Sequence, residues 1–179
     1  MTHQFLLDVM LGKLTTYLRM CGYDTQYAQE EGIEADDVIR KRAASTDRTL
    51  LTRDRELAAR TNDAVLLESR NIEGQLAELH HHGIGIELPT YPERCSVCNG
   101  RVAEIDPAQR PEHAPDAVSQ VWQCEDCDQY FWKGSHWERV RETIATSPAR
   151  TSSGETHGGV DQAAVATESA DHGSCTVPL

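Results

Sequence analysis

The sequence of 179 residues has little lysine and no long apolar run. No stretch approaches the roughly 20 apolar residues of a membrane-spanning helix, so no membrane association is expected. Only three of its 17 basic residues are lysine, whereas Asp and Glu total 29 and the net charge is −12. Acidic, lysine-poor composition is typical of proteins adapted to concentrated salt, where self-repulsion is screened. We therefore expect a halophilic source.

The first residues have neither a basic region nor a small-residue cleavage site, so a cytoplasmic location is expected. Outside the secretory route, the six cysteines are expected to be reduced. Four of them form two C-x-x-C units, Cys95 with Cys98 and Cys124 with Cys127. Two such turns complete a closed tetrahedral site, which predicts one structural zinc ion. The alternative, four free or redox thiols, fits the paired spacing less well.

Composition divides the chain into three regions. Residues 1–88 alternate short apolar runs with amphipathic stretches and predict an α/β domain. Residues 89–142 are rich in Cys, Trp and Pro and predict the zinc ribbon. Residues 143–179 hold mainly Ser, Thr, Gly, Ala and acidic residues, too little apolar surface to offset the entropy of ordering, so a disordered tail is expected.

The first region predicts a parallel sheet flanked by helices. Four compact apolar runs predict strands at residues 4–7, 25–28, 49–52 and 64–67. An amphipathic stretch follows each of them, and this βαβα alternation is typical of parallel sheets with helices on both faces. The order 2-1-3-4 would make strands 1 and 3 neighbours. A short extra strand is expected at residues 83–88.

Three aspartates lie at junctions between strands and helices. Asp8 closes the first strand, Asp54 closes the third, and Asp36 opens the helix between strands 2 and 3. Because functional groups collect at the carboxyl ends of parallel strands, we expect these carboxylates to converge there. Carboxylates are preferred ligands of Mg²⁺ and Mn²⁺, which can activate water against a phosphodiester. The pattern therefore suggests a catalytic Mg²⁺ or Mn²⁺ site.

Each aspartate also has an ordinary structural explanation, since Asp is a favoured helix N-cap. Asp37 could replace Asp36 as a ligand. Lys13, near the start of the first helix, could hold a substrate phosphate or could be a solvated lysine.

Acidic chains repel nucleic acid, so binding would need a local basic patch. The candidates are Arg40, Arg42, Arg53 and Arg55. In the ribbon, Trp122, Trp132 and Trp137 could stack RNA bases, but a small aromatic core is the favoured interpretation. His136 is a possible spare ligand for the zinc ion.

Several segments together resemble a known family. They are residues 5–14 (FLLDVMLGKL), 18–25 (LRMCGYDT), 50–54 (LLTRD), 92–100 (PERCSVCNG), the second cysteine pair and 134–139 (GSHWER). The chain resembles, over roughly residues 4–140, the Mut-seven C-terminal RNase family, a branch of the PIN-like nucleases. The resemblance implies a PIN-like α/β fold with a fused zinc ribbon. It implies that Asp8, Asp36 and Asp54 bind the catalytic metal and that Lys13 is a polar member of the site.

PIN-like nucleases usually have a fourth acidic residue late in the domain, and Asp63, Glu68 and Glu73 are the candidates here. The leading hypothesis is a metal-dependent endoribonuclease acting on RNA, with the ribbon aiding RNA or partner binding. The alternative is a non-catalytic RNA- or ribosome-binding zinc-ribbon module on a degenerate PIN-like scaffold. A phospho-receiver domain ranks below both, because the sequence lacks that fold's paired acids after the first strand.

Overall fold

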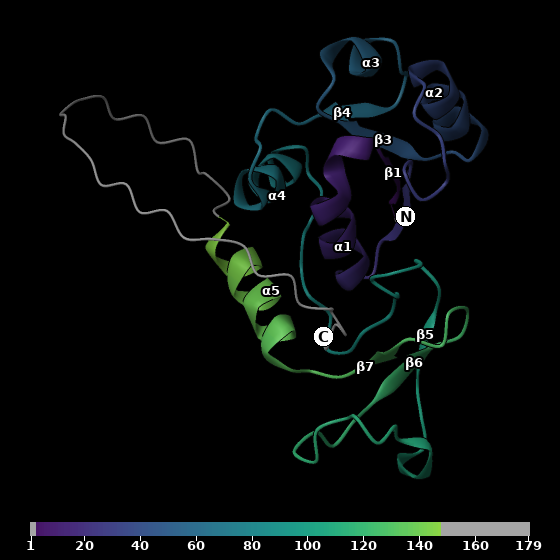
Figure 1. Cartoon of the computed structure of the whole chain (residues 1–179). Coiled ribbons are helices and arrows are strands. Elements are labelled where there is room, and N and C mark those ends of the chain that lie inside the picture. The colour runs from purple at the N-terminus through teal and green to yellow at the C-terminus, as the bar shows by residue number, and fades with distance from the viewer. Residues whose placement is uncertain (1–2, 148–179) are drawn as a thin grey trace, which may run out of the picture.

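A computed structural model of the chain describes residues 3–147. Figure 1 shows the path of the chain. The elements, in order, are β1 (Gln4–Leu7), the 3-10 turn η1 (Val9–Leu11), α1 (Gly12–Met20), β2 (Asp24–Tyr27), α2 (Asp36–Ser45), β3 (Thr49–Thr52), α3 (Arg55–Ala59), β4 (Ala64–Leu66), α4 (Ile72–His81), β5 (Val102–Glu104), the 3-10 turn η2 (Pro107–Gln109), β6 (Trp122–Cys124), β7 (Tyr130–Phe131) and α5 (Ser135–Thr146).

The tail was predicted to begin at residue 143, and this boundary is corrected because α5 continues through Thr146. The helix extends past the predicted boundary because Val140 is buried and the partly buried Ile144 packs against the main core. The rest of the predicted tail lies outside the described residues.

The predicted mixed α/β architecture and strand order are confirmed. The first sheet has the order β2-β1-β3-β4, and all three strand pairs are parallel. In the register, Leu6 of β1 lies opposite Gln26 of β2 on one side and Leu50 of β3 on the other. The carboxyl ends of β1 and β3 are therefore neighbours, as expected for the order 2-1-3-4.

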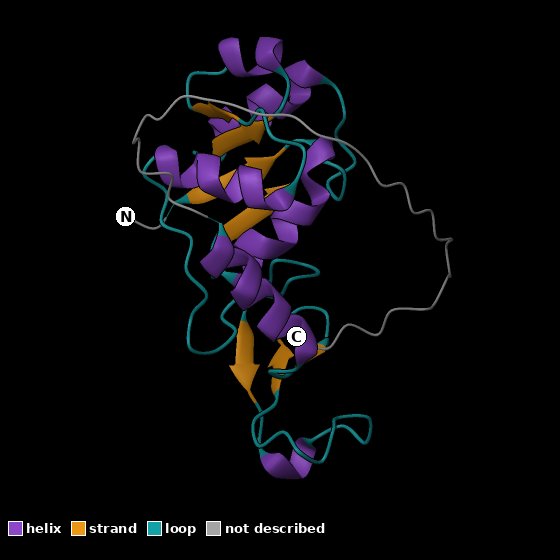
Figure 2. Ribbon diagram, turned by 90° about the vertical axis from the view of Figure 1, so that its left-hand side faces the viewer, coloured by secondary structure: helices purple, strands orange, loops and turns teal. Residues whose placement is uncertain are grey.

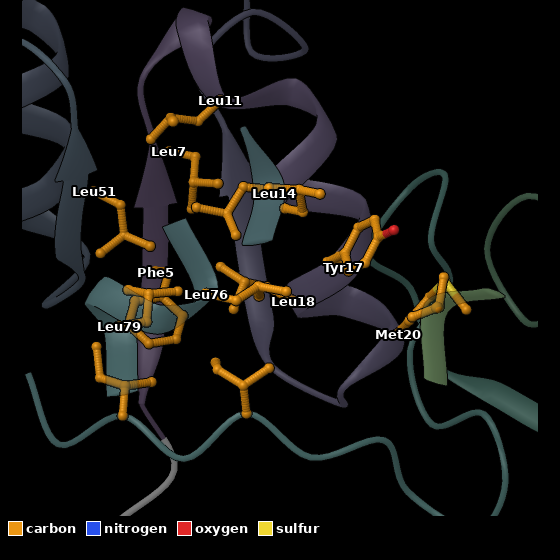
Figure 3. Packing of buried hydrophobic residues seen from close by; sticks show 14 of the residues in the cluster. Phe5, Leu7, Leu11, Leu14, Tyr17, Leu18, Met20, Leu51, Leu76 and Leu79 are labelled. Carbon is orange, nitrogen blue, oxygen red and sulfur yellow. The ribbon is translucent and has the colours of Figure 1, made fainter. Parts of the chain in front are cut away.

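Each face of this sheet is covered by helices (Figure 2). Side chains alternate between faces along a strand, so Phe5 and Leu7 join one apolar cluster and Leu6 joins the other. Figure 3 shows Leu14 and Leu18 of α1 packed in the first cluster together with these strand residues. The second cluster lies under α2 and α3. The helix α1 ends at Met20, and Gly22 takes the left-handed φ of +84° that closes the helix.

The extra strand predicted at residues 83–88 is absent from the structure. This segment forms a turn followed by irregular chain that pairs with no strand among residues 3–147. Its isoleucines, Ile84 and Ile86, are buried in the main core, which explains the apolar pattern without a strand. The hydroxyl of Tyr23 donates to the carbonyl of Gly85, so a side chain rather than a neighbouring strand satisfies that backbone group.

The ribbon is a three-stranded antiparallel sheet of order β5-β6-β7. Its aromatic residues are buried rather than displayed, with Trp122, Trp132 and Trp137 exposed by only 4%, 6% and 4%. The favoured interpretation of an aromatic core is therefore supported, and base stacking on these rings is not. The main apolar cluster also runs across the predicted boundary at residue 88, because it includes Trp122 and Trp137 together with Phe5 and Leu18.

One buried arginine connects the ribbon to the first sheet. Arg19 of α1 is 2% exposed, and its guanidinium donates to the two carboxylate oxygens of Glu30 at 3.1 and 2.6 Å. It also donates to the carbonyl of Thr25 in β2 at 3.0 Å. Its remaining bonds go to the carbonyls of Ser96 and Val97, at 3.3 and 2.7 Å. Those carbonyls belong to the turn between Cys95 and Cys98, so that turn is fixed against α1 and β2.

Asn99 makes a second connection, to the edge strand β2. Its side-chain oxygen accepts from the backbone amide of Thr25 at 2.9 Å, and its amide donates to Asp24 at 2.8 Å. Partial burial tends to raise the pKa of Asp24, but the bond from Asn99 and the charges of Arg48 and Arg94 outweigh it and lower that pKa. An exposed sheet edge is thus covered by a side chain of the ribbon.

We expect Arg19→Ala to lower the free energy of unfolding by about 2–4 kcal/mol, because buried carbonyls lose a charged donor. The control is Arg55→Ala, which removes an exposed ion pair whose side chains are 76% and 65% exposed. That change should cost less than about 1 kcal/mol. Urea denaturation of both variants measures the difference, and equal losses would contradict the connecting role of Arg19.

Candidate functional site

The four predicted cysteines come together. Cys95, Cys98, Cys124 and Cys127 place their sulfur atoms within 4.8 Å of one another. Two of the separations are 3.6 Å for Cys95 to Cys127 and 3.4 Å for Cys98 to Cys124. Disulfide sulfur atoms lie about 2.05 Å apart, whereas a tetrahedral ion with Zn–S bonds of about 2.3 Å needs sulfur atoms about 3.8 Å apart. The cluster can therefore hold a metal ion such as zinc.

The backbone around the cysteines has the tight turns that such a cluster needs. Asn99 and Asp128, which follow the two pairs, both have left-handed φ values, of 68° and 58°. The amides of Cys98 and Asp126 point to the sulfurs of Cys95 and Cys124, each at 3.4 Å. A side chain at Gly100 would place its Cβ 2.9 Å from the sulfur of Cys124, so only glycine fits beside the cluster.

The chemistry of the donors also fits a soft or borderline cation. Burial raises the pKa of the Cys95 thiol, so the thiolate at this position needs a cation to stabilise it. The possible spare ligand His136 is not a member of the cluster. The donor set of four sulfurs leaves no position for a substrate, which makes the predicted role structural.

The carboxylate edge is built around Asp8 and Asp54. Asp8 is 5% exposed, and its Oδ1 caps η1 by accepting from the amide of Val9 at 2.6 Å. Asp54 caps α3 with its Oδ1, which accepts from Glu56 at 2.8 Å and from Leu57 at 2.9 Å. The capping explanation is therefore correct for both residues. Capping leaves the second oxygen of Asp54 without a hydrogen-bond partner among residues 3–147, so it does not exclude a further role.

Thr52 joins these two aspartates. Its hydroxyl donates to Oδ2 of Asp8 at 2.8 Å and accepts from the backbone amide of Asp54 at 2.9 Å. Thr52 is fully buried and ends β3, beside the end of β1. The sequence reasoning missed this residue, because a threonine at a strand end has no distinctive pattern. The only signal was its position two residues before Asp54.

Asp36 is the first residue of α2 and is exposed, as is its neighbour Asp37. Asp37 pairs with Arg60 at 2.7 Å, whereas Asp36 has no ion pair within residues 3–147. Asp36 is therefore the freer of the two alternatives. Within that part of the chain, the four cysteines are the one group of three or more potential ligands whose atoms lie within 4.8 Å. The assignment of Asp8, Asp36 and Asp54 to one Mg²⁺ or Mn²⁺ ion stays a prediction.

The positions of Asp63, Glu68 and Glu73 in the fold narrow the choice of a fourth acidic residue. Asp63 precedes β4, which places it at the amino end of the sheet, opposite the carboxylate edge. Glu68 follows β4 and pairs with the exposed Arg55 at 2.5 Å. Glu73 lies in the first turn of α4. By position in the sheet, Asp63 is the least suitable of the three.

Most of the expected basic patch is neutralised by local acids. Arg40 pairs with Asp37 at 3.7 Å, and Arg55 pairs with Glu68. Arg42 pairs with Glu31. Lys13, in contrast, is exposed at the start of α1 and makes no ion pair within the described part of the chain. Three of the four arginines that were predicted to form a basic patch for RNA are therefore occupied by ion pairs within the protein.

In class, this is an α/β protein with a parallel four-stranded sheet and a C-terminal ribbon that can hold a metal ion. The chain belongs to the Mut7-C RNAse domain family, whose model matches residues 3–144. The match includes both the parallel sheet and the cysteine ribbon, and it confirms the resemblance seen in the sequence. No curated protein and no solved structure matches the chain. Among residues 3–147, no helix is both long and apolar enough to cross a membrane.

We expect the purified chain to contain about one zinc ion, and Cys98→Ser to lose most of it. Loss of zinc should lower the free energy of unfolding by at least about 2 kcal/mol, because metal binding contributes to folding. The control is Cys21→Ser, since burial raises the pKa of Cys21 to about 12 and this thiol lies outside the cluster. Elemental analysis and thermal unfolding measure both effects. A wild-type chain without metal, or equal metal in Cys98→Ser, would contradict the assignment.

Proposed function

We propose that this chain is a Mg²⁺- or Mn²⁺-dependent ribonuclease of the PIN-like type that hydrolyses phosphodiester bonds in RNA. The proposal rests on membership of the Mut7-C RNAse domain family. The observation that carries it within the fold is that Asp8 and Asp54 lie at the carboxyl ends of adjacent parallel strands, where the hydroxyl of Thr52 contacts the carboxylate of Asp8 and the backbone amide of Asp54.

The donor set at this edge suits a hard divalent cation. Asp8 and Asp54 offer carboxylate oxygens, and Asp36 opens the neighbouring helix α2. When bound, such an ion supplies positive charge to the phosphodiester and favours deprotonation of an attacking water. Thr52 holds the carboxylate of Asp8 in one orientation. Lys13 is proposed to contact a substrate phosphate as a point charge.

The ribbon has a structural part in this proposal. We infer that zinc at the four cysteines holds the turn that contacts Arg19 and Asn99, and through them the strand β2. The three tryptophans are buried, so they are not assigned a role in stacking RNA bases. A cytoplasmic location and adaptation to concentrated salt stay predictions from composition.

The alternative function, an RNA- or ribosome-binding module without catalysis, has one observation in its favour. Asp36 is exposed and does not form a close cluster with Asp8 and Asp54 in the structure. A scaffold that has lost its metal site would also retain Asp8 and Asp54, because both cap helical turns.

Substitution of the aspartates by asparagine separates these functions, because asparagine is as good an N-cap as aspartate but lacks the charge. We expect Asp8→Asn and Asp54→Asn to lower Mn²⁺-dependent cleavage of labelled RNA by roughly 100-fold or more, with little change in stability. The matched control is Asp63→Asn, at the opposite edge of the sheet, which should retain full activity.

Equal cleavage by the wild type and both variants would point to a contaminating nuclease and contradict the proposal. Binding of RNA by the wild type without cleavage, with either Mg²⁺ or Mn²⁺, would favour the non-catalytic module. Asp36→Asn and Asp37→Asn, assayed in parallel, decide which of these two carboxylates contributes.

A further inference from the structure

The helices α1 and α5 border a groove of about 720 Å³. Tyr17 and Val140 are buried and contribute to its lining. The helices meet where the hydroxyl of Tyr17 donates to that of Thr143 at 3.4 Å. Figure 1 shows α5 alongside α1 although the two are far apart in sequence. The groove therefore exists only because the chain after the ribbon returns to the first domain.

The groove contains two cations that form no ion pair within residues 3–147. Lys13 from α1 and Arg139 from α5 both line it. Both are exposed, and neither has an ion-pair partner within residues 3–147. Two residues further along α5, Arg141 lines a different groove and pairs with Glu138. One carboxylate, Glu142, also lines the groove, so Lys13 and Arg139 leave it with a net positive charge.

His136 adds a neutral hydrogen-bonding group to the same groove. Burial and the neighbouring charge of Arg139 lower the pKa of His136. The imidazole is therefore mainly neutral at pH 7 and can donate one hydrogen bond without adding charge. His136, Arg139 and Lys13 therefore place hydrogen-bond donors from both helices along the same groove.

We propose that this groove binds the phosphodiester backbone of a single RNA strand, with Lys13 and Arg139 contacting phosphate oxygens and His136 donating a hydrogen bond. The proposal rests on the proposed function for the identity of the ligand as RNA. It adds a binding surface on α5 to the carboxylate edge of the sheet.

The position of the groove favours a strand that leads to the carboxylates. Its cations come from two helices, Lys13 from α1 and Arg139 from α5. Lys13 stands at the start of α1, which follows Asp8 after the three-residue turn η1. A strand bound along α1 would thus be led toward Asp8. The chain as a whole has a net charge of −12 and repels phosphate. Cations that form no ion pair, gathered in a groove, can still attract phosphate locally.

The test is the affinity of the zinc-loaded chain for a fluorescein-labelled single-stranded RNA, measured by anisotropy without added Mg²⁺ or Mn²⁺. We expect Arg139→Ala to weaken binding by about three- to tenfold at low salt and to reduce the salt-dependence slope by about 0.7. Arg141→Ala removes the same charge from the same helix and should change affinity by less than about twofold. Glu142→Gln should tighten binding by about twofold, which loss of structure would not produce.

Equal effects of Arg139→Ala and Arg141→Ala on affinity would contradict RNA binding in the groove, because the affinity would then depend only on the net charge of the protein. An unchanged affinity in Arg139→Ala, while Asp8→Asn abolishes cleavage, would overturn the groove but retain the ribonuclease. If the wild type binds RNA without cleaving it, the affinities still decide the groove, although the ribonuclease is lost. Displacement of the RNA by polyglutamate as effectively as by unlabelled RNA would assign the groove to an acidic protein partner instead.

Discussion

The buried guanidinium of Arg19 is the interaction on which the arrangement of this molecule depends. A buried charge is costly unless its donors are satisfied. Here the carboxylate of Glu30 and three backbone carbonyls share that task. Two of the carbonyls are in the turn of the first cysteine pair, so the charge is satisfied only when the ribbon is docked. The fold of the cysteine turn and the burial of Arg19 therefore stabilise each other.

Docking of the ribbon has consequences for the position of α5. The chain leaves the ribbon at Phe131 and returns as α5, whose Trp137 and Val140 enter the same core as Leu14 and Leu18 of α1. Without the docked ribbon, α5 would have no fixed position against α1. The groove that contains Lys13 and Arg139 lies between α1 and α5, so it depends on this return of the chain. The docked ribbon and the shape of this groove are therefore parts of one packing arrangement.

Local patterns predicted the sheet well, because strand order follows from short apolar runs separated by helical stretches. The clustering of the four cysteines also followed from spacing alone, although the identity of the ion stays a prediction. The strand predicted from the apolar pattern of residues 83–88 was wrong, because Ile84 and Ile86 are buried but belong to no β-strand. Apolar periodicity reports burial, and it indicates a strand only where a partner edge is available.

Long-range polar partners could not be predicted. Arg19 looks like any helix-surface arginine until its distant carbonyl partners are seen, and Thr52 becomes important only beside Asp8. The same limit explains the basic patch. Arg40, Arg42 and Arg55 cluster in sequence, yet ion pairs occupy all three. Whether a cation is available to a ligand depends on which acids fold next to it.

This distinction between paired and unpaired cations bears on how so acidic a chain would attract RNA, its proposed substrate. The net charge of −12 acts over the Debye length, which is about 10 Å at 0.1 M salt and about 3 Å at 1 M. Concentrated salt therefore suppresses the global repulsion more completely than it suppresses a direct contact between a guanidinium and a phosphate. Salt also weakens the contact itself, because counterions released into concentrated salt gain less entropy. The balance favours a few well-positioned cations, such as Lys13 and Arg139, over a broad basic surface that the acidic residues would neutralise.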